Sequence, residues 1–169
     1  MFKKILFSTL LSILSYSASS AQEPKEPFTP EGVLAEGVDS TASTNPYTGE
    51  SGQARKGTVA ATLNNVALLN NLLYEKASPE NELKIQKIID AITPLIPSLR
   101  VIGVFDLFTV DEWLSTDDQP GRILVATLYI QQYPQNITPK NKQRLLQIRN
   151  TTKIKILSNA ITKALIDHK

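Results

Sequence analysis

The reactive side chains of this sequence are few, and they argue against enzyme chemistry. The chain has no cysteine, and its one histidine, His168, is the residue before the last. A general base must be held by its neighbours, whereas chain ends are usually mobile. We therefore expect no histidine-based triad, no thiol chemistry and no zinc site. No cofactor motif occurs either, so the sequence predicts a protein that is not an enzyme and binds no cofactor or metal.

A cluster of acidic residues around Trp113 is the strongest remaining candidate for catalysis. Its members are Asp106, Asp111, Glu112, Asp117 and Asp118. Paired carboxylates catalyse hydrolysis when they have a defined separation and one raised pKa. A calcium loop needs regularly spaced acids and a central glycine, and that pattern is missing. We expect helix caps and a solvated surface here, with Trp113 in the core, and we keep an Asp/Glu hydrolase as an alternative.

A basic segment at residues 140–169 is the main candidate for binding. The whole chain has a formal net charge of +2, but this segment holds eight bases and a single acid, Asp167. The bases are Lys140, Lys142, Arg144, Arg149, Lys153, Lys155, Lys163 and Lys169. A solvated helix face is the simplest interpretation, and an anionic partner surface is the functional one. Nucleic acid is disfavoured, because residues 134–169 contain no aromatic side chain for stacking.

The first residues have the features of a cleavable export signal. Lys3 and Lys4 precede an apolar run over residues 5–16, and small side chains follow up to Ala21. The run is shorter than the roughly 20 residues that a membrane span needs. We expect cleavage after Ala21 and a periplasmic or secreted protein, with an uncleaved interfacial helix as the alternative. The absence of cysteine excludes a lipoprotein anchor and agrees with a bacterial envelope protein that needs no disulfide.

Residues 22–57 are predicted to form a flexible arm. The segment is rich in proline, glycine, serine and threonine, and large apolar residues are sparse. Such a segment buries too little apolar surface to offset its ordering entropy. The alternative is a recognition strand that becomes ordered on a partner.

Residues 58–169 are predicted to form one globular domain that is mainly α-helical. Apolar residues recur at helical spacing over residues 59–76, where Thr58 is the expected cap, and again after Ser78 and Pro79. These two helices should form an antiparallel hairpin. Another helix should begin at Thr138 and Pro139. The stretch 150–152 should divide the last part into two helices, although 153–156 could instead form a short strand.

The middle of the domain is harder to assign. Residues 99–106 and 122–131 are continuous apolar runs rich in β-branched and aromatic side chains, so an α+β fold with strands there is the alternative. Two start signals favour helices. Thr109 with Glu112 has the spacing of a capping box, and Pro120 follows a possible cap at Asp118. Glycine is also scarce after residue 57, whereas hairpin-rich domains need turn glycines.

One hexamer resembles a segment of a known group of proteins. Residues 45–50 read Asn-Pro-Tyr-Thr-Gly-Glu and precede a helix rich in leucine and asparagine. This arrangement resembles the amino-terminal region of exported accessory proteins of type IV pilus and conjugation machinery. The resemblance implies an envelope location and protein partners, and it places residues 97–103 at the start of a small β domain. As a local structure, the hexamer is a turn in which Pro46 fixes one backbone angle and Gly49 supplies a permissive one.

These observations predict an exported, non-enzymatic interaction protein of the envelope, and the resemblance implies an accessory component of a conjugation, type IV secretion or pilus apparatus. The alternative is a secreted binding or effector protein that acts through its basic end. The candidate partner-binding residues are Asn45, Pro46, Tyr47, Lys140, Lys142, Arg144, Arg149, Lys153 and Lys155.

Overall fold

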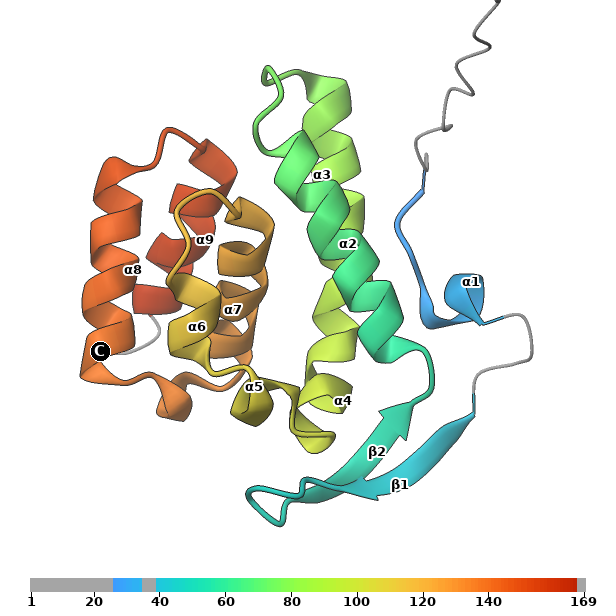
Figure 1. Cartoon of the computed structure of the whole chain (residues 1–169). Helices are drawn as coiled ribbons and strands as arrows, with labels where there is room; N and C mark the ends of the chain where they lie inside the picture. Colours follow the sequence, from blue (N-terminus) through green and yellow to red (C-terminus); the bar gives the residue numbers. More distant parts are fainter. Residues whose placement is uncertain (1–25, 35–38, 167–169) are drawn as a thin grey trace, which may run out of the picture.

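The computed structural model describes residues 26–34 and 39–166, and it confirms the mainly helical fold class (Figure 1). The helices are α1 (Pro30–Val33), α2 (Thr58–Leu72), α3 (Pro79–Ile92), α4 (Ile96–Val101), α5 (Val104–Leu107), α6 (Val110–Leu114), α7 (Pro120–Gln132), α8 (Pro139–Thr151) and α9 (Lys155–Ile166). Two short 3₁₀ turns cover Thr93–Leu95 and Pro134–Asn136. The strands β1 (Ser40–Thr44) and β2 (Ser51–Arg55) form an antiparallel pair.

The predicted hairpin of α2 and α3 is present. Ser78 caps α3, because its hydroxyl accepts a hydrogen bond from the Asn81 amide, and Pro79 occupies the first turn as expected. The start of α2 differs from the prediction. Gly57, rather than Thr58, is the cap residue, and it has a left-handed backbone with a φ of +79°. Thr58 is already helical and buried, so its side chain packs in the core and does not cap the helix.

The alternative of strands near 99–106 and 122–131 is wrong. Residues 99–106 lie in α4, a turn and α5, and residues 122–131 lie inside α7. Every residue of α7 from Ile123 to Ile130 is buried. A helix that is covered on all sides is apolar all round, so its sequence lacks the helical periodicity of apolar and polar residues. This explains why the sequence could not distinguish a helix from a strand here. The capping box of Thr109 and Glu112 is present at the start of α6.

Helix α7 is the centre of the fold, and α2, α6 and α9 pack against it. The crossing with α2 is very close. The Gly121 amide donates a hydrogen bond of 2.8 Å to Oδ1 of Asn70. A Cβ atom at Gly121 would lie 2.6 Å from the Val66 carbonyl oxygen, so only glycine permits this approach.

The last two helices form a second hairpin that covers the other side of α7 (Figure 1). Thr138 and Asn141 form a capping box at the start of α8. The predicted division is present, since α8 ends at Thr151 and α9 begins at Lys155. Residues 153–156 form no strand. Leu145, Ile148, Leu157 and Ile161 are buried in the same core cluster as α7.

The prediction of a flexible arm over residues 22–57 is wrong for residues 26–34 and 39–57. The backbone of Phe28 exchanges two hydrogen bonds, of 2.8 and 2.7 Å, with the side-chain amide of the buried Asn65 on α2. Strand β2 packs on α4, and a Cβ on Gly52 would lie 2.7 Å from the Val101 side chain. Hydrogen bonds from buried asparagines thus hold a segment that has few apolar side chains of its own.

Some expectations lie outside the described residues. These are the signal segment 1–21, residues 22–25 of the arm, and the terminal residues 167–169 with His168. Among the helices of residues 26–34 and 39–166, none combines the length and the apolar character that crossing a bilayer requires.

Candidate functional site

Four of the five acidic side chains around Trp113 make polar contacts within the chain. Asp106 accepts a hydrogen bond of 2.8 Å from Nδ2 of Asn45, and Glu112 completes the capping box of α6. Asp111 pairs with Lys140 at 2.7 Å, and Asp117 pairs with Arg144 at 2.5 Å. Within the part of the chain that the structure describes, no three acidic or histidine side chains are placed to hold a metal ion.

The turn at residues 45–50 fastens the β hairpin to the helical domain. Asn45 is 1% exposed, and its Nδ2 donates to the Arg100 carbonyl at 2.7 Å as well as to Asp106. Its Oδ1 accepts from the amides of Tyr47 and Thr48. Of the three candidate partner residues in the turn, Asn45 is therefore occupied internally, while Pro46 and Tyr47 are exposed.

A polar pocket of about 360 Å³ lies beside this turn. Tyr129 lines it, stacks on Phe105 at 4.0 Å and accepts a hydrogen bond of 2.6 Å from Nδ2 of Asn136. Burial raises the pKa of the Tyr129 hydroxyl above its ordinary value, although the bond from Asn136 opposes that rise. Arg100 lies 4.1 Å above the Tyr133 ring and pairs with Glu50 at 2.6 Å. These polar side chains have their partners within the fold. The groups that line the pocket therefore stabilise the structure and leave few sites for a ligand.

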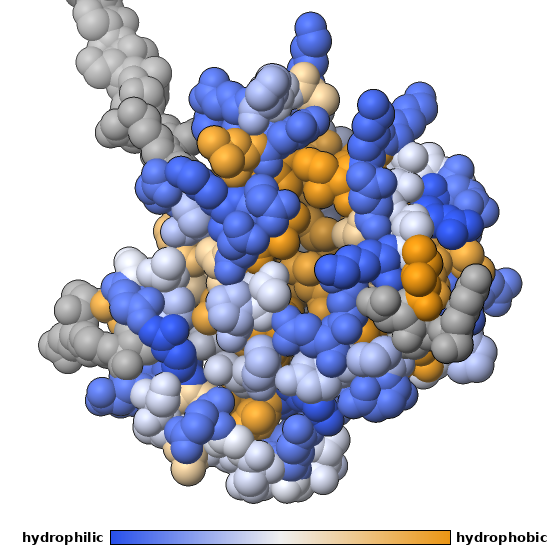
Figure 2. Space-filling model, turned by 180° about the vertical axis from the view of Figure 1, so that it is seen from behind, coloured by the Kyte–Doolittle hydropathy of each residue, from blue (hydrophilic) through white to orange (hydrophobic). Residues whose placement is uncertain are grey.

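The larger opening is a groove of about 800 Å³ between the two helical hairpins. One wall is the α2–α3 corner and the other is the α8–α9 corner, and α7 contributes to the floor. Figure 2 shows apolar side chains exposed in the hollow between two polar lobes. The aliphatic lining residues are Leu72, Leu73, Ile85, Ile123, Ile148, Ile154, Ile156 and Leu157. We call this opening the hairpin groove.

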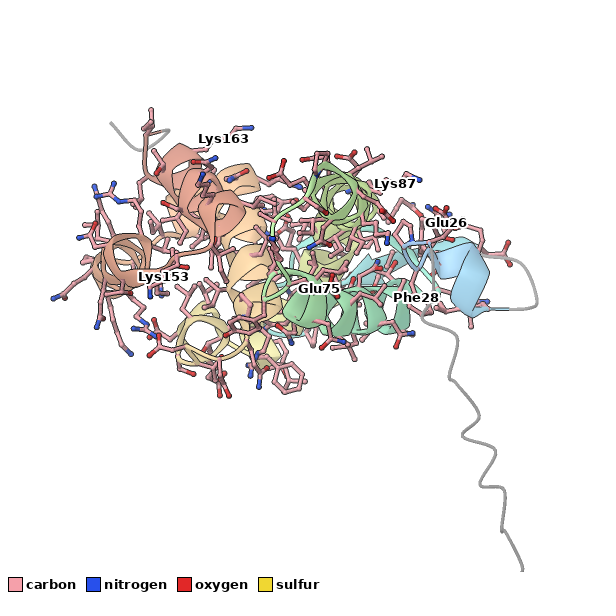
Figure 3. The ribbon with its side chains drawn as sticks, turned by 90° about the horizontal axis from the view of Figure 1, so that it is seen from above. Glu26, Phe28, Glu75, Lys87, Lys153 and Lys163 are labelled. Carbon is pink, nitrogen blue, oxygen red and sulfur yellow. The ribbon has the colours of Figure 1, made fainter. Side chains whose placement is uncertain are left out.

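The two walls of the hairpin groove carry opposite charges. Glu75 and Glu82 lie on the α2–α3 wall, and Lys153 and Lys155 lie on the α8–α9 wall. Figure 3 shows Glu75 and Lys153 on opposite sides of α7. All four side chains are exposed, and none has an ion-pair partner among residues 26–34 and 39–166. The groove is therefore a strip of apolar surface between an acidic rim and a basic rim.

A clasp of polar contacts joins the two walls at one border of the groove. The Tyr74 hydroxyl donates to the Asp117 carbonyl at 3.4 Å, and the Asp117 carboxylate pairs with Arg144. Arg144 also donates to the Leu114 carbonyl at 2.9 Å. Tyr74 lies in the α2–α3 loop, Asp117 in the α6–α7 loop and Arg144 on α8, so the clasp links both hairpins.

The structure divides the predicted basic residues into two groups. Arg144, Lys153 and Lys155 line the hairpin groove. Lys140, Lys142 and Arg149 lie on α8 and do not line it. Lys140 is paired with Asp111, so it is partly neutralised within the chain.

Sequence reasoning missed the acidic wall and Asn81. Asn81 lines the groove, is 6% exposed, and donates from Nδ2 to the Leu72 carbonyl at 3.0 Å. Its Oδ1 has no hydrogen-bond partner within the described part of the chain. An asparagine in the first turn of a helix resembles an ordinary capping residue, so the only signal was its place on the apolar side of α3.

In the described residues, the fold is a small set of helices that encloses an open, mainly apolar groove between oppositely charged rims. Residues 46–133 match the family model described as "Domain of unknown function (DUF7709)", and the chain, of which this is more than half, belongs to that family. The match contains the acidic wall and the floor of the groove, whereas α8 and α9 follow it. No curated protein and no solved structure matches the chain.

Proposed function

We propose that this protein is an exported, non-enzymatic interaction protein, and that its hairpin groove binds an amphipathic helix of a partner protein. The observation that carries the proposal is the groove itself, an apolar strip with a free acidic rim and a free basic rim. Amphipathic helices bind in such grooves through apolar side chains spaced at i, i+3, i+4 and i+7.

The apolar lining of the groove is the first argument for an occupant. Leu72 on one wall and Ile154 and Ile156 on the other remain partly exposed in this hollow. An apolar surface rimmed by polar residues is typical of a site that is covered by another molecule. Covering it removes apolar surface from water at about 25 cal/mol per Å² before the costs of association.

The two rims favour a peptide over a lipid. A single acyl chain offers one head group at one end, whereas this groove presents Glu75 and Glu82 along one side and Lys153 and Lys155 along the other. A helix with a basic flank and an acidic flank satisfies both rims at once. Such complementarity fixes the orientation of the bound helix and raises the association rate more than the affinity.

The place of action remains the prediction made from the sequence. The segment at residues 1–21 favours export to the periplasm or beyond, and the turn at residues 45–50 resembles that of conjugation and type IV pilus accessory proteins. We therefore propose a partner in the cell envelope, with such an apparatus as the first candidate.

A designed peptide tests the groove directly. The probe is a fluorescent amphipathic helix of roughly 14 residues, long enough for three to four turns, with lysines on one flank and glutamates on the other. We expect saturable binding measured by anisotropy, and we expect it to weaken about tenfold in Lys153→Glu/Lys155→Glu, because two attractions become repulsions.

A matched variant and a matched peptide serve as controls. Lys142→Glu/Lys163→Glu makes the same change in net charge outside the groove and should leave binding within about twofold. A peptide with all ionic side chains replaced by glutamine tests the apolar contribution alone. Equal loss in both double variants, or no binding at about 1 mM peptide, would contradict the proposal.

A second function is favoured by the charge of the end of the chain. Lys142, Lys153, Lys155 and Lys163 have no carboxylate partner within residues 26–34 and 39–166. A secreted protein could use them to bind an anionic surface, as the sequence alternative predicts. Sedimentation with vesicles that contain anionic lipid tests this. Strong binding that is lost in both double variants would favour the surface function over the groove.

A further inference from the structure

The β hairpin has one open edge. Within the pair, the Asn45 amide donates to the Glu50 carbonyl at 2.7 Å and the Lys56 amide donates to the Asp39 carbonyl at 3.4 Å. Since hydrogen-bonded residues alternate along a strand, residues 39, 41, 43 and 45 face β2. The backbone N–H and C=O groups of Ser40, Ala42 and Thr44 therefore point away from the hairpin.

The opposite edge, on β2, is covered. Helix α4 packs against β2, and the Ser98 hydroxyl lies 3.5 Å from the Gln53 carbonyl on that edge. In Figure 1, β1 is on the outside of the molecule and β2 lies between it and the helices. Among the described residues, no hydrogen bond reaches the outward backbone groups of Ser40, Ala42 or Thr44.

This open edge lacks the usual protection. Natural edge strands are blunted by charged side chains, prolines or bulges that prevent pairing with another chain. Strand β1 reads Ser-Thr-Ala-Ser-Thr, so it carries no charge and no proline, and it pairs with β2 in a continuous register without a bulge. An exposed strand of this kind is a template for one more strand.

The sequence of β1 is also symmetric in chemical type. Two hydroxyl residues precede Ala42 and two follow it. If two copies of β1 pair antiparallel with Ala42 opposite Ala42, Ser40 lies opposite Thr44 of the other copy and Thr41 lies opposite Ser43. In this register all outward backbone groups of Ser40, Ala42 and Thr44 meet their counterparts. The side chains form hydroxyl pairs, which favour cross-strand contact.

We propose that two copies of this protein associate through their β1 strands into a four-stranded antiparallel sheet, with Ala42 on the two-fold axis. A symmetric interface of this kind is self-complementary and closed, so it ends at the dimer. The flanking residues are compatible, because Asp39 lies opposite Asn45 of the other copy and meets no like charge. The hairpin and the hairpin groove lie at opposite ends of the molecule in Figure 1, so the pair presents two free grooves.

Cross-linking tests the register. The chain has no cysteine, so Ala42→Cys introduces a single thiol. Hydrogen-bonded residues across an antiparallel pair have Cα atoms about 5.5 Å apart, within the range that a disulfide spans. We expect Ala42→Cys to form a covalent dimer in a glutathione redox buffer. Gln53→Cys is the control, because Gln53 lies opposite Ala42 on β2 and is exposed but away from the axis. Equal cross-linking of the two variants would overturn the proposal.

Charge reversal tests the dimer without a covalent bond. Ala42→Lys and Ala42→Glu each place like charges opposite one another on the axis, so each should raise the dimer dissociation constant at least about tenfold. An equimolar mixture should regain dimers, measured by sedimentation velocity, because Lys then faces Glu. Circular dichroism verifies that each variant is folded. A wild-type protein that stays monomeric at about 0.5 mM, or a mixture that gains no dimer, would overturn the proposal.

Discussion

At the scale of single residues, buried asparagines do the work that apolar side chains do elsewhere. The buried Asn45 and Asn65 each bind backbone groups of a segment distant in the sequence. An asparagine side chain both donates and accepts, so it can satisfy the exposed backbone of an irregular segment. This is how the polar segment before α2 is held against the helices.

The clearest test of this role is Asn45→Ala. The change removes both donated bonds and leaves the Arg100 carbonyl and the amides of Tyr47 and Thr48 without their partner. We expect a loss of about 2–4 kcal/mol in the free energy of unfolding, measured with urea. Thr48→Ala, which removes an exposed hydroxyl and its 3.3 Å bond from the Glu50 amide, should cost less than about 1 kcal/mol. Equal effects would show that Asn45 is not the anchor.

Tyr129 predicts how stability depends on pH. Its pKa is raised in the folded protein by burial, while in the unfolded chain it is near the ordinary value of 10.0. Above that pH the unfolded chain loses the proton that the folded protein still binds, so stability falls as the pH rises. Below it the contribution is complete. Tyr129→Phe should therefore show a shallower loss of stability above pH 10 in thermal unfolding, although the loss of the Asn136 bond lowers stability at neutral pH. An unchanged alkaline slope would contradict this.

At this scale the sequence predicted local contacts and missed distant ones. The caps at Ser78, Thr109 and Thr138 could be predicted, because each depends on residues three positions away. The roles of Asn45 and Asn81 could not, because their partners come from other elements. A polar residue in a turn has the same appearance in a sequence whether it is solvated or buried.

At the scale of elements, the contact between α2 and α7 sets the position of the α2–α3 wall. It depends on Gly121, whose missing side chain lets the Val66 carbonyl approach. Asn70 on α2 then accepts a hydrogen bond from the Gly121 amide. This amide lies in the first turn of α7 and has no partner within the helix. The acidic rim of the groove is therefore positioned by a glycine on another element.

We expect Gly121→Ala to push these helices apart. A Cβ atom cannot remain 2.6 Å from a carbonyl oxygen, so the backbone must shift at a cost of about 2–4 kcal/mol. Gly32→Ala is the control, because its Cβ would meet Thr29 Oγ1 at an ordinary 3.5 Å and should change stability by less than about 1 kcal/mol. Thermal unfolding of both variants measures the difference. A Gly121→Ala protein as stable as the control would show that the crossing is looser than described.

A helix could be predicted from the sequence where one of its faces is buried and the other exposed. Where all faces are buried, helix and strand could not be distinguished. The hairpin of α2 and α3 has one covered side, and its sequence shows the stripe. Helix α7 is covered on all sides, so its sequence fits a buried strand equally well. The β hairpin was missed because its side chains bury little apolar surface and its stability comes from the contacts of β2 with α4.

At the scale of the whole molecule, the fold is two helical hairpins on either side of one central helix. The family match ends at Tyr133, yet α9 buries Leu157, Ile161 and Ala164 against the core that contains α7. The matched segment therefore leaves one side of α7 uncovered. The groove could not be predicted from the sequence, because its walls are brought together only by this tertiary arrangement.

A truncation tests whether the last two helices belong to the folding unit. Residues 46–133 alone expose the side of α7 that α9 covers, so we expect a poorly soluble protein that binds a hydrophobic dye. Extension to residue 166 should restore a single cooperative unfolding transition. A fragment 46–133 that unfolds cooperatively at the same temperature as the longer protein would contradict this.

The clasp at Asp117 has a mechanical consequence. Asp117 contacts Tyr74 through its carbonyl and Arg144 through its carboxylate, and the Asp117 side chain is 82% exposed whereas that of Arg144 is 22% exposed. Contacts of this kind are worth about 1 kcal/mol or less and weaken as salt is added. The distance between the two hairpins should therefore depend on ionic strength, short in dilute buffer and longer at high salt. Spin labels at Glu75 and Lys153, which are exposed on the two walls and take no part in the clasp, would record that opening as a longer distance.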